Sequence, residues 1–404
     1  MSKLFLILVA SVAALPAATW AADWQFEPRI ELGGIYNDNY RLVPSGIGKI
    51  DVWGPQIDAA FAFHYAGPTT KVTVVPRLHS VYFPDHTDQD TNDQFLTFQL
   101  DHIGEKSTSG LVASYQREDT VNTEQPGAAT AVGSSTDLGT IVNRDNGLIT
   151  LRNRRELLRF QPGATYKMGA RSDLELGASY EKATYADSLV GGQIDYQYYS
   201  GRIGIQFAST PTSVTTFRVL GSKYDPTQAF ASAATYGGEI EWRKNVSASQ
   251  QYYLRAGAAN TRVDAIGTTP SSSETALVGG GGGRWLRERS NLFLDYVRDV
   301  VPNAAGTVVT RDELRLYIGR KLRHQVEAFV SGLGSRETQS GAGNAGSERK
   351  YAAVAVGFNW RYSREFSLAP RFEHRWQDYS GTIGAASGNS AYISFIYEPR
   401  APVQ

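Results

Sequence analysis

Histidine gives this chain its most direct route to acid–base or metal chemistry. The sequence contains six: His64, His79, His86, His102, His324 and His374. None stands in a His-x-Ser spacing, and His79 and Ser80 are adjacent, so in a strand their side chains would point to opposite faces. Asp85 and His86 resemble an acid–base pair, but they fall in a polar stretch typical of a solvated loop. The histidines therefore predict no catalytic site.

Carboxylates two residues apart, Asp173/Glu175 and Glu239/Glu241, would share one strand face and could work as acid and base. Arg243 follows the second pair on the same face and Arg218 lies on a nearby strand, which favours ion pairing instead. Cysteine is absent, which excludes a thiol nucleophile, a disulfide framework and a Cys-ligated metal. No phosphate-binding or nucleotide-binding motif occurs. We expect no enzyme, no metal and no cofactor.

Arginine is the remaining candidate, with 30 Arg against 10 Lys. Its planar guanidinium suits carboxylates and sugar hydroxyls. Twelve arginines fall on the polar positions of alternating segments: Arg29, Arg77, Arg159, Arg202, Arg218, Arg243, Arg255, Arg284, Arg315, Arg361, Arg371 and Arg375. They could neutralise nearby Asp and Glu and so hold the protein's shape, or they could line a conduit for an anionic or hydroxyl-rich polymer. The sequence leaves both interpretations open.

The elements that carry these arginines alternate with a period of two. Residues 24–32 place Trp, Phe, Pro, Ile and Leu on one parity and Gln, Glu and Arg on the other, and residues 96–101, 158–167, 173–181 and 354–362 repeat the pattern. A period of two indicates strands with one apolar and one polar face. Because a charge facing lipid would be costly, the arginines are predicted to face a polar lumen.

The connections between these strands alternate in length. Short turns are predicted at 67–70, 104–107, 169–172, 209–213, 244–249, 287–290, 320–324 and 363–366, and longer polar loops at 37–49, 84–93, 119–146, 187–192, 225–233, 262–274, 300–307, 335–349 and 378–388. Nine hairpins indicate 18 strands of about 10 residues, with 16 as the alternative. The prediction is all-β: a transmembrane antiparallel up-and-down β-barrel. A periplasmic sandwich or propeller is disfavoured because no blade repeat occurs.

The N-terminus has the three-part layout of a secretory signal. Lys3 precedes an apolar run over residues 4–15, and Pro16 and small residues lead to Ala21 and Ala22, after either of which we expect cleavage. The predicted domains are a signal peptide over 1–22 and a barrel over 23–404 in the outer membrane of a Gram-negative cell. The formal net charge of +0 gives no argument for nucleic acid.

One segment resembles a known family. The stretch from Gly34 to Leu42, Gly-Ile-Tyr-Asn-Asp-Asn-Tyr-Arg-Leu, is similar to the first-hairpin motif of the EpsL-type outer-membrane proteins of exopolysaccharide operons, associated with exosortase (PEP-CTERM) systems. That motif is aromatic-x-Asp-Asn followed by Arg-Leu, which places Asp38, Asn39, Arg41 and Leu42 at the matching positions. The stretch from Phe160 to Tyr185 also resembles those barrels.

The resemblance implies a role in exporting or assembling exopolysaccharide. The implied partners are the polymer itself and periplasmic export or assembly proteins, together with the outer-membrane lipid and lipopolysaccharide around any such barrel. Two alternatives stay open: a general diffusion porin for small solutes, and, with less support because no catalytic set was found, an outer-membrane hydrolase.

Overall fold

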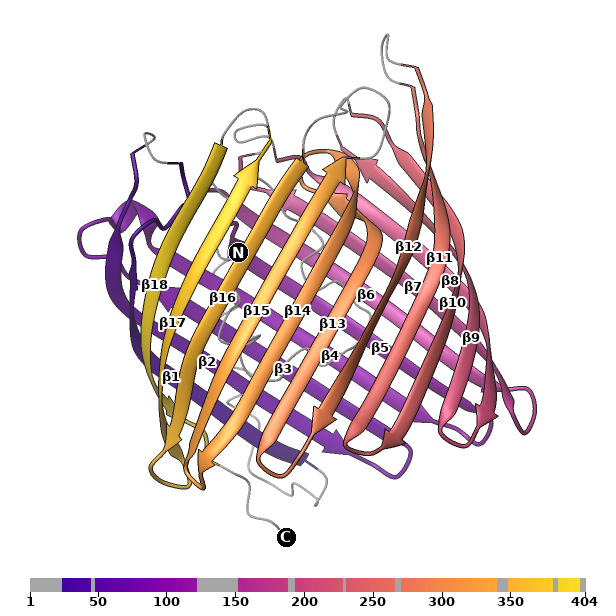
Figure 1. The fold of residues 1–404 in the computed structure, drawn as a ribbon, viewed down its shortest axis with the longest axis horizontal. Helices are drawn as coiled ribbons and strands as arrows, with labels where there is room; N and C mark the ends of the chain where they lie inside the picture. The colour runs from indigo at the N-terminus through magenta and orange to yellow at the C-terminus, as the bar shows by residue number, and fades with distance from the viewer. Residues whose placement is uncertain are drawn as a thin grey trace.

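A computed structural model describes residues 24–44, 48–121, 152–187, 193–227, 230–265, 270–339, 348–380 and 384–399. Within them, 18 antiparallel strands form one closed sheet, each paired with its neighbours in sequence (Figure 1). The predicted β-barrel and its strand number are confirmed. The predicted signal peptide and most of the predicted loop 119–146 lie outside the described residues. No described helix is long and apolar enough to cross a membrane.

The elements follow one another as hairpins. Their bounds are β1 Trp24–Asn37, β2 Val52–Ala66, β3 Thr70–Val81, the 3₁₀ turn η1 Thr87–Gln89, β4 Thr91–Ile103, β5 Ser107–Asp119, β6 Arg154–Lys167, β7 Ser172–Tyr185, β8 Tyr196–Thr210, β9 Ser213–Pro226, β10 Ala233–Ser247, β11 Gln250–Val263, β12 Ser272–Leu286, β13 Ser290–Asn303, β14 Thr307–Arg323, β15 Val326–Gln339, β16 Glu348–Arg361, β17 Phe366–Tyr379 and β18 Gly384–Tyr397. We call the end with the short connections the turn end and the opposite one the loop end.

The strands are longer than the predicted 10 residues, running from 12 in β3 to 17 in β14. Three predicted turns were placed too early, because β8 continues to Thr210, β10 to Ser247 and β14 to Arg323. In all three hairpins the partner strand continues the ladder to a bulge next to the turn. Polar residues there keep their backbone hydrogen bonds, which alternation of side chains cannot reveal.

The outer face of the sheet is apolar. On β9, Phe217 and Val219 are exposed, whereas Arg218 between them is enclosed by carboxylates. Aromatic rings gather on several strands near the turn end, for example Trp24 against Tyr65 at 5.3 Å between ring centroids. An apolar band with aromatic residues at its rim is how outer-membrane barrels meet lipid. The chain therefore has the architecture of an outer-membrane barrel.

The ring closes between the first and last strands. Residues Ile30 to Asn37 of β1 pair with Ser390 to Tyr397 of β18, whereas Trp24 to Arg29 pair with β2 alone. This offset is the stagger that a barrel of tilted strands requires.

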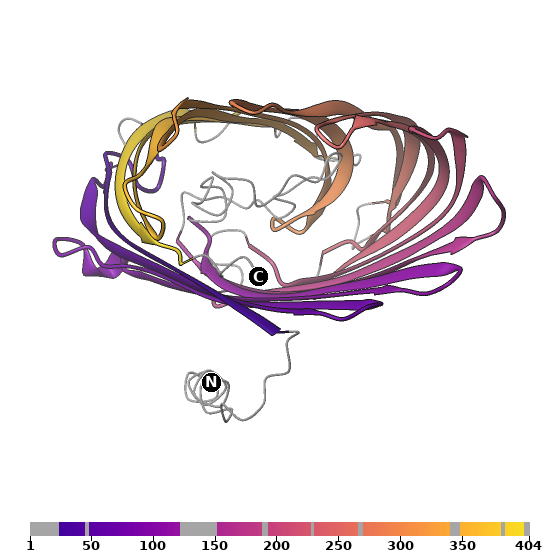
Figure 2. The ribbon, with the colours of Figure 1, turned by 90° about the horizontal axis from the view of Figure 1, so that it is seen from below.

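One hairpin leaves the wall. β12 and β13 pair only between Gly279 and Leu286 on one side and Asn291 and Arg298 on the other, so residues 272–278 of β12 have no partner on β13. Beyond the last of these pairs, toward the loop end, the β13–β14 hairpin bends into the interior of the barrel (Figure 2, orange). The glycine run 279–283 lets β12 and β13 lie close together, since a Cβ atom on Gly280 would lie only 2.3 Å from the carbonyl oxygen of Tyr296.

Candidate functional site

The inner wall carries a network of ion pairs across β7 to β13. We call it the first network; it comprises Arg202, Arg218, Arg243, Arg255, Glu175, Glu239, Glu241 and Asp299. At its centre, Arg218 lies 3.1 Å from Glu175 and 3.0 Å from Glu241. Contacts between β7 and β9 skip β8, which is feasible only on the concave side of the sheet. Four guanidinium groups meet four carboxylates, so the network is balanced in charge.

A second network runs from the middle of β13 and β14 to the loop end of β14, β15 and β16. It comprises Arg311, Arg315, Arg349, Asp295, Glu313 and Glu337. Arg311 is almost fully buried and lies 2.6 Å from Glu337 and 3.1 Å from Glu313. The Tyr253 hydroxyl donates a hydrogen bond to Asp295 at 2.5 Å. Three positive and three negative groups again balance.

A third group on β17 is enclosed completely. Glu373 and Arg375 have no exposed surface and lie 3.8 Å apart. The Arg371 guanidinium lies over the ring of Tyr392 at 4.1 Å. Within the described part of the chain the nitrogens of Arg375 meet no hydrogen-bond acceptor. The charges of Glu373 and Arg375 are therefore shielded from solvent.

The family-like motif folds the first loop inward. The Asp38 carboxylate accepts hydrogen bonds from the backbone N–H and the side-chain amide of Asn389, at 2.6 and 2.7 Å. Asn39 donates to the carbonyl oxygens of Val43 and Ser387 and accepts from the Val43 N–H. These bonds fasten the loop to β18.

The remaining motif residues complete the lock. Arg41 donates to Gln89 at 3.0 Å. Leu42 has a positive φ of 49° and is fully buried beside Tyr351 and Ala386. Tyr40 is also enclosed, and burial raises its pKa above the ordinary value. All four motif positions thus have a local structural role.

Most of the twelve predicted arginines are paired. Ten form an ion pair: Arg29, Arg77, Arg159, Arg202, Arg218, Arg243, Arg255, Arg315, Arg371 and Arg375. Arg284 and Arg361 form none with a described residue and lie near the turn end. Solvent reaches some side chains well, with Arg202 58% and Arg243 46% exposed. The structure brings Arg202, Arg218, Arg243 and Arg255 together and leaves the others in separate groups.

Sequence reasoning missed several buried groups at the loop end. Arg155 pairs with Glu118, and Arg311 and Arg349 share Glu337. Around Arg311 the alternation disappears, because residues 308–311 are buried on both faces. One sequence signal could have indicated these ion pairs: an acidic residue near an arginine in the same hairpin, such as Glu313 two residues after Arg311.

Metal chemistry finds no support among the residues that the structure describes, where no three His, Asp or Glu side chains form a group that could hold an ion.

Comparison with known proteins gives matches of fold alone. No family model and no curated protein matches the sequence. The structure is similar to the outer membrane protein OpdK from Pseudomonas aeruginosa, with 8% identity and a TM-score of 0.47, covering 93% of this chain and 99% of that one. It is similar to OccK11 (OpdR) from the same organism, with 10% identity, a TM-score of 0.46 and coverage of 93% and 96%. It is also similar to the apoprotein form of the FrpB iron transporter from Neisseria meningitidis, with 7% identity, a TM-score of 0.46 and coverage of 93% and 81%.

Proposed function

We propose that this chain is an outer-membrane transport barrel that takes part in exopolysaccharide export, with its charged inner wall as the conduit. A closed sheet with an apolar outer face provides a polar path through a bilayer without exposing backbone groups to lipid. The ring of 18 strands leaves an interior wider than that of small barrels whose side chains fill the lumen.

The observation that carries the proposal is the charge balance of the wall. The first network pairs four arginines with four carboxylates, so it offers many donors and acceptors without a strong net field. A sugar hydroxyl both donates and accepts, as water does. A hydroxyl-rich polymer can therefore exchange bonds with water for bonds with the wall, and many weak sites let it move on. Transit needs no covalent step.

The resemblance of residues 34–42 to EpsL-type proteins supports a polysaccharide as the cargo. On this proposal, periplasmic export or assembly proteins would deliver the polymer to the turn end. Lipopolysaccharide and outer-membrane lipid would surround the apolar face.

A general diffusion porin is the second candidate. The exposure of Arg202 and Arg243 favours it, because a passive pore for small anions also needs guanidinium groups that solvent can reach.

Deletion of the gene separates the two candidates. Export predicts that polymer accumulates in the periplasm or that its synthesis stops, while growth on small solutes stays normal; complementation with the intact gene should restore surface polymer. A porin predicts impaired uptake of small solutes with normal surface polymer. Surface polysaccharide that is unchanged in the deletion strain would rule out the export proposal.

A further inference from the structure

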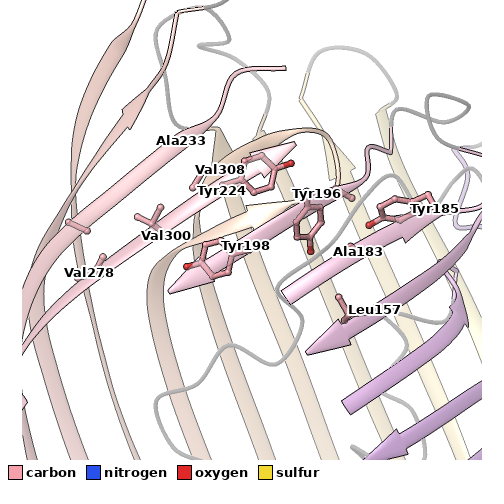
Figure 3. Packing of buried hydrophobic residues seen from close by; sticks show 12 residues of the cluster. Leu157, Ala183, Tyr185, Tyr196, Tyr198, Tyr224, Ala233, Val278, Val300 and Val308 are labelled. Carbon is pink, nitrogen blue, oxygen red and sulfur yellow. The ribbon is translucent and has the colours of Figure 1, made fainter. Parts of the chain in front are cut away.

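The inward end of the β13–β14 hairpin, residues 300–308, is called the tip here. Its side chains Val300, Ala304 and Val308 pack in one cluster with Tyr196, Tyr198 and Tyr224 of β8 and β9 (Figure 3). Those tyrosines belong to the inner wall, since Tyr196 donates to Glu181 of the inner face at 3.0 Å. The tip thus covers part of the lumen wall at the loop end.

Hydrogen bonds between the tip and the described part of the wall are found at Asn303 and Ala304, and one of them runs from the Asn303 side-chain amide to Glu337 at 3.4 Å. The Ile194 N–H donates to the Ala304 carbonyl at 2.8 Å, and the Tyr224 hydroxyl donates to the Asn303 carbonyl at 3.3 Å. The covering side chains are small and aliphatic. The tip has no ladder with β12, because pairing stops at Gly279 and Arg298. It could therefore swing from the tyrosines while β13, β14 and β15 keep most of their pairing.

The covered surface has the chemistry of a sugar site. Tyr196 and Tyr224 lie on adjacent strands with ring centroids 5.3 Å apart. Glu181 accepts from Tyr196 and also from Arg159, at 2.8 Å. Aromatic faces provide flat apolar area on which the C–H face of a pyranose ring can lie. Adjacent charged groups make strong hydrogen bonds to its hydroxyls.

We propose that the tip is a displaceable cover over a tyrosine surface, formed by Tyr196, Tyr198 and Tyr224, that binds the sugar rings of the transported polymer. This inference rests on the proposed function and adds a subsite and its regulation. A ligand can displace the cover only by binding the uncovered state better. The polymer supplies that difference, because its rings take the place of Val300, Ala304 and Val308 on the tyrosines.

A disulfide tests the cover. The chain has no cysteine, so the double variant Ile194→Cys/Ala304→Cys reports without background. Oxidation should cross-link tip and wall and lower the potassium conductance in planar bilayers by about twofold relative to the reduced protein, whereas the wild type should ignore oxidant and reductant. Heat-dependent migration on gels, measured for both redox forms, verifies that the barrel is folded. A folded variant that does not cross-link, or equal conductance in both forms, overturns the cover.

Defined oligosaccharides test the binding surface. Maltohexaose, a neutral probe, and oligogalacturonate, an acidic one, should interrupt the current through the reduced variant and not through the oxidised one. Tyr198→Ala should weaken this block by about tenfold. Tyr236→Ala, on the outer face, serves as the matched control and should leave the block unchanged. Block by neither probe, or block that ignores both Tyr198 and the cross-link, overturns the binding surface.

The two proposals can fail separately. The bilayer measurements use the purified barrel and do not depend on export in cells. Normal surface polymer in the deletion strain would overturn the proposed function while the cover still opened. Loss of export on deletion with no sugar block would overturn the cover while the proposed function stood.

Discussion

The two ends of the barrel wall differ, and β14 shows both. At its loop end, residues 308–311 are buried without interruption, whereas at its turn end residues 320–323 are all exposed. The same division separates the arginines: Arg311 and Arg375 have almost no exposed surface, and Arg243 lies in solvent near the turn end of β10.

The two ends differ in packing and hydration. At the loop end, the first loop and the hairpin tip fold inward and bury charged groups and tyrosines, so this end is packed like a protein core. At the turn end, charged side chains stay hydrated and can meet a solute. The same type of substitution should therefore affect stability, selectivity or labelling differently at the two ends.

The largest difference between the two ends is expected in how much a substitution lowers the stability of the barrel. Arg311→Met leaves Glu313 and Glu337 buried with one cation fewer, and we expect a loss of about 3–5 kcal/mol in the free energy of unfolding. Arg243→Met removes one exposed pair and should cost less than about 1 kcal/mol. Urea titration of the barrel in phospholipid vesicles, followed by Trp fluorescence, measures both. Equal losses would abolish the distinction between the two ends.

A substitution in the first loop, also at the loop end, should lower the stability by a smaller amount. Asn39→Ala removes three hydrogen bonds to Val43 and Ser387, and we expect about 1–3 kcal/mol of destabilisation. Proteolysis of the folded protein should also reach residues near the loop sooner. The exposed Asn245 at the turn end provides the control, since Asn245→Ala should change neither measurement. A fully stable, protease-resistant Asn39 variant would contradict the role of the motif as a lock.

Ion selectivity should respond at the exposed arginines. The double variant Arg202→Glu/Arg243→Glu should shift the permeability ratio toward cations by about two- to threefold, because fixed charge near the path selects ions of opposite sign. Reversal potentials in a potassium chloride gradient measure the ratio. Arg320→Glu, on the outer face near the turn end, should leave it unchanged. The largely enclosed Arg218 and Arg255 are left unchanged, since their loss would remove a cation from several carboxylates. Selectivity that shifts equally in the control variant would place the exposed arginines away from the path.

Labelling gives the finest comparison. Gln99→Cys, on the exposed turn-end part of β4, should react with a charged water-soluble maleimide about tenfold faster than Thr235→Cys, which is buried against Thr261 at the loop end. Phe98→Cys, on the lipid-facing parity, should react only with a membrane-soluble reagent. If Thr235→Cys reacts as fast as Gln99→Cys, the loop end is open.

Side-chain alternation predicted the barrel because one face of every strand meets lipid. It put Arg218 on the polar face and on a strand near Glu239 and Glu241, but it could not give the individual contacts, since parity gives neither the register nor the curvature of the sheet. Pairing with Glu239 depends on the register of β9 and β10, and the contact with Glu175 depends on the curvature of the sheet.

The inward hairpin could not be predicted in the same way. The predicted loop 300–307 proved to be largely strand, because Val300 and Val308 pack in the cluster that contains Tyr224 and most of the tip is buried. Turn-forming residues such as Pro302, Asn303 and Gly306 suggested a loop, since the sequence does not reveal a packing partner so far away in the chain.

The closing pair of strands has a consequence for how the chain folds. Ile30 pairs with Tyr397, so the wall cannot close until nearly the whole chain has been synthesised. Loop closure becomes costlier only slowly with length, by about 0.6 kcal/mol for each doubling. Pairing of β1 with β18 therefore comes late in folding, but the length of the chain between them adds little to its free-energy cost. Until it forms, β1 and β18 are two free sheet edges, and any chain with exposed strand edges can pair wrongly with another. The lifetime of the unclosed sheet, more than its final stability, then governs the yield of folded protein.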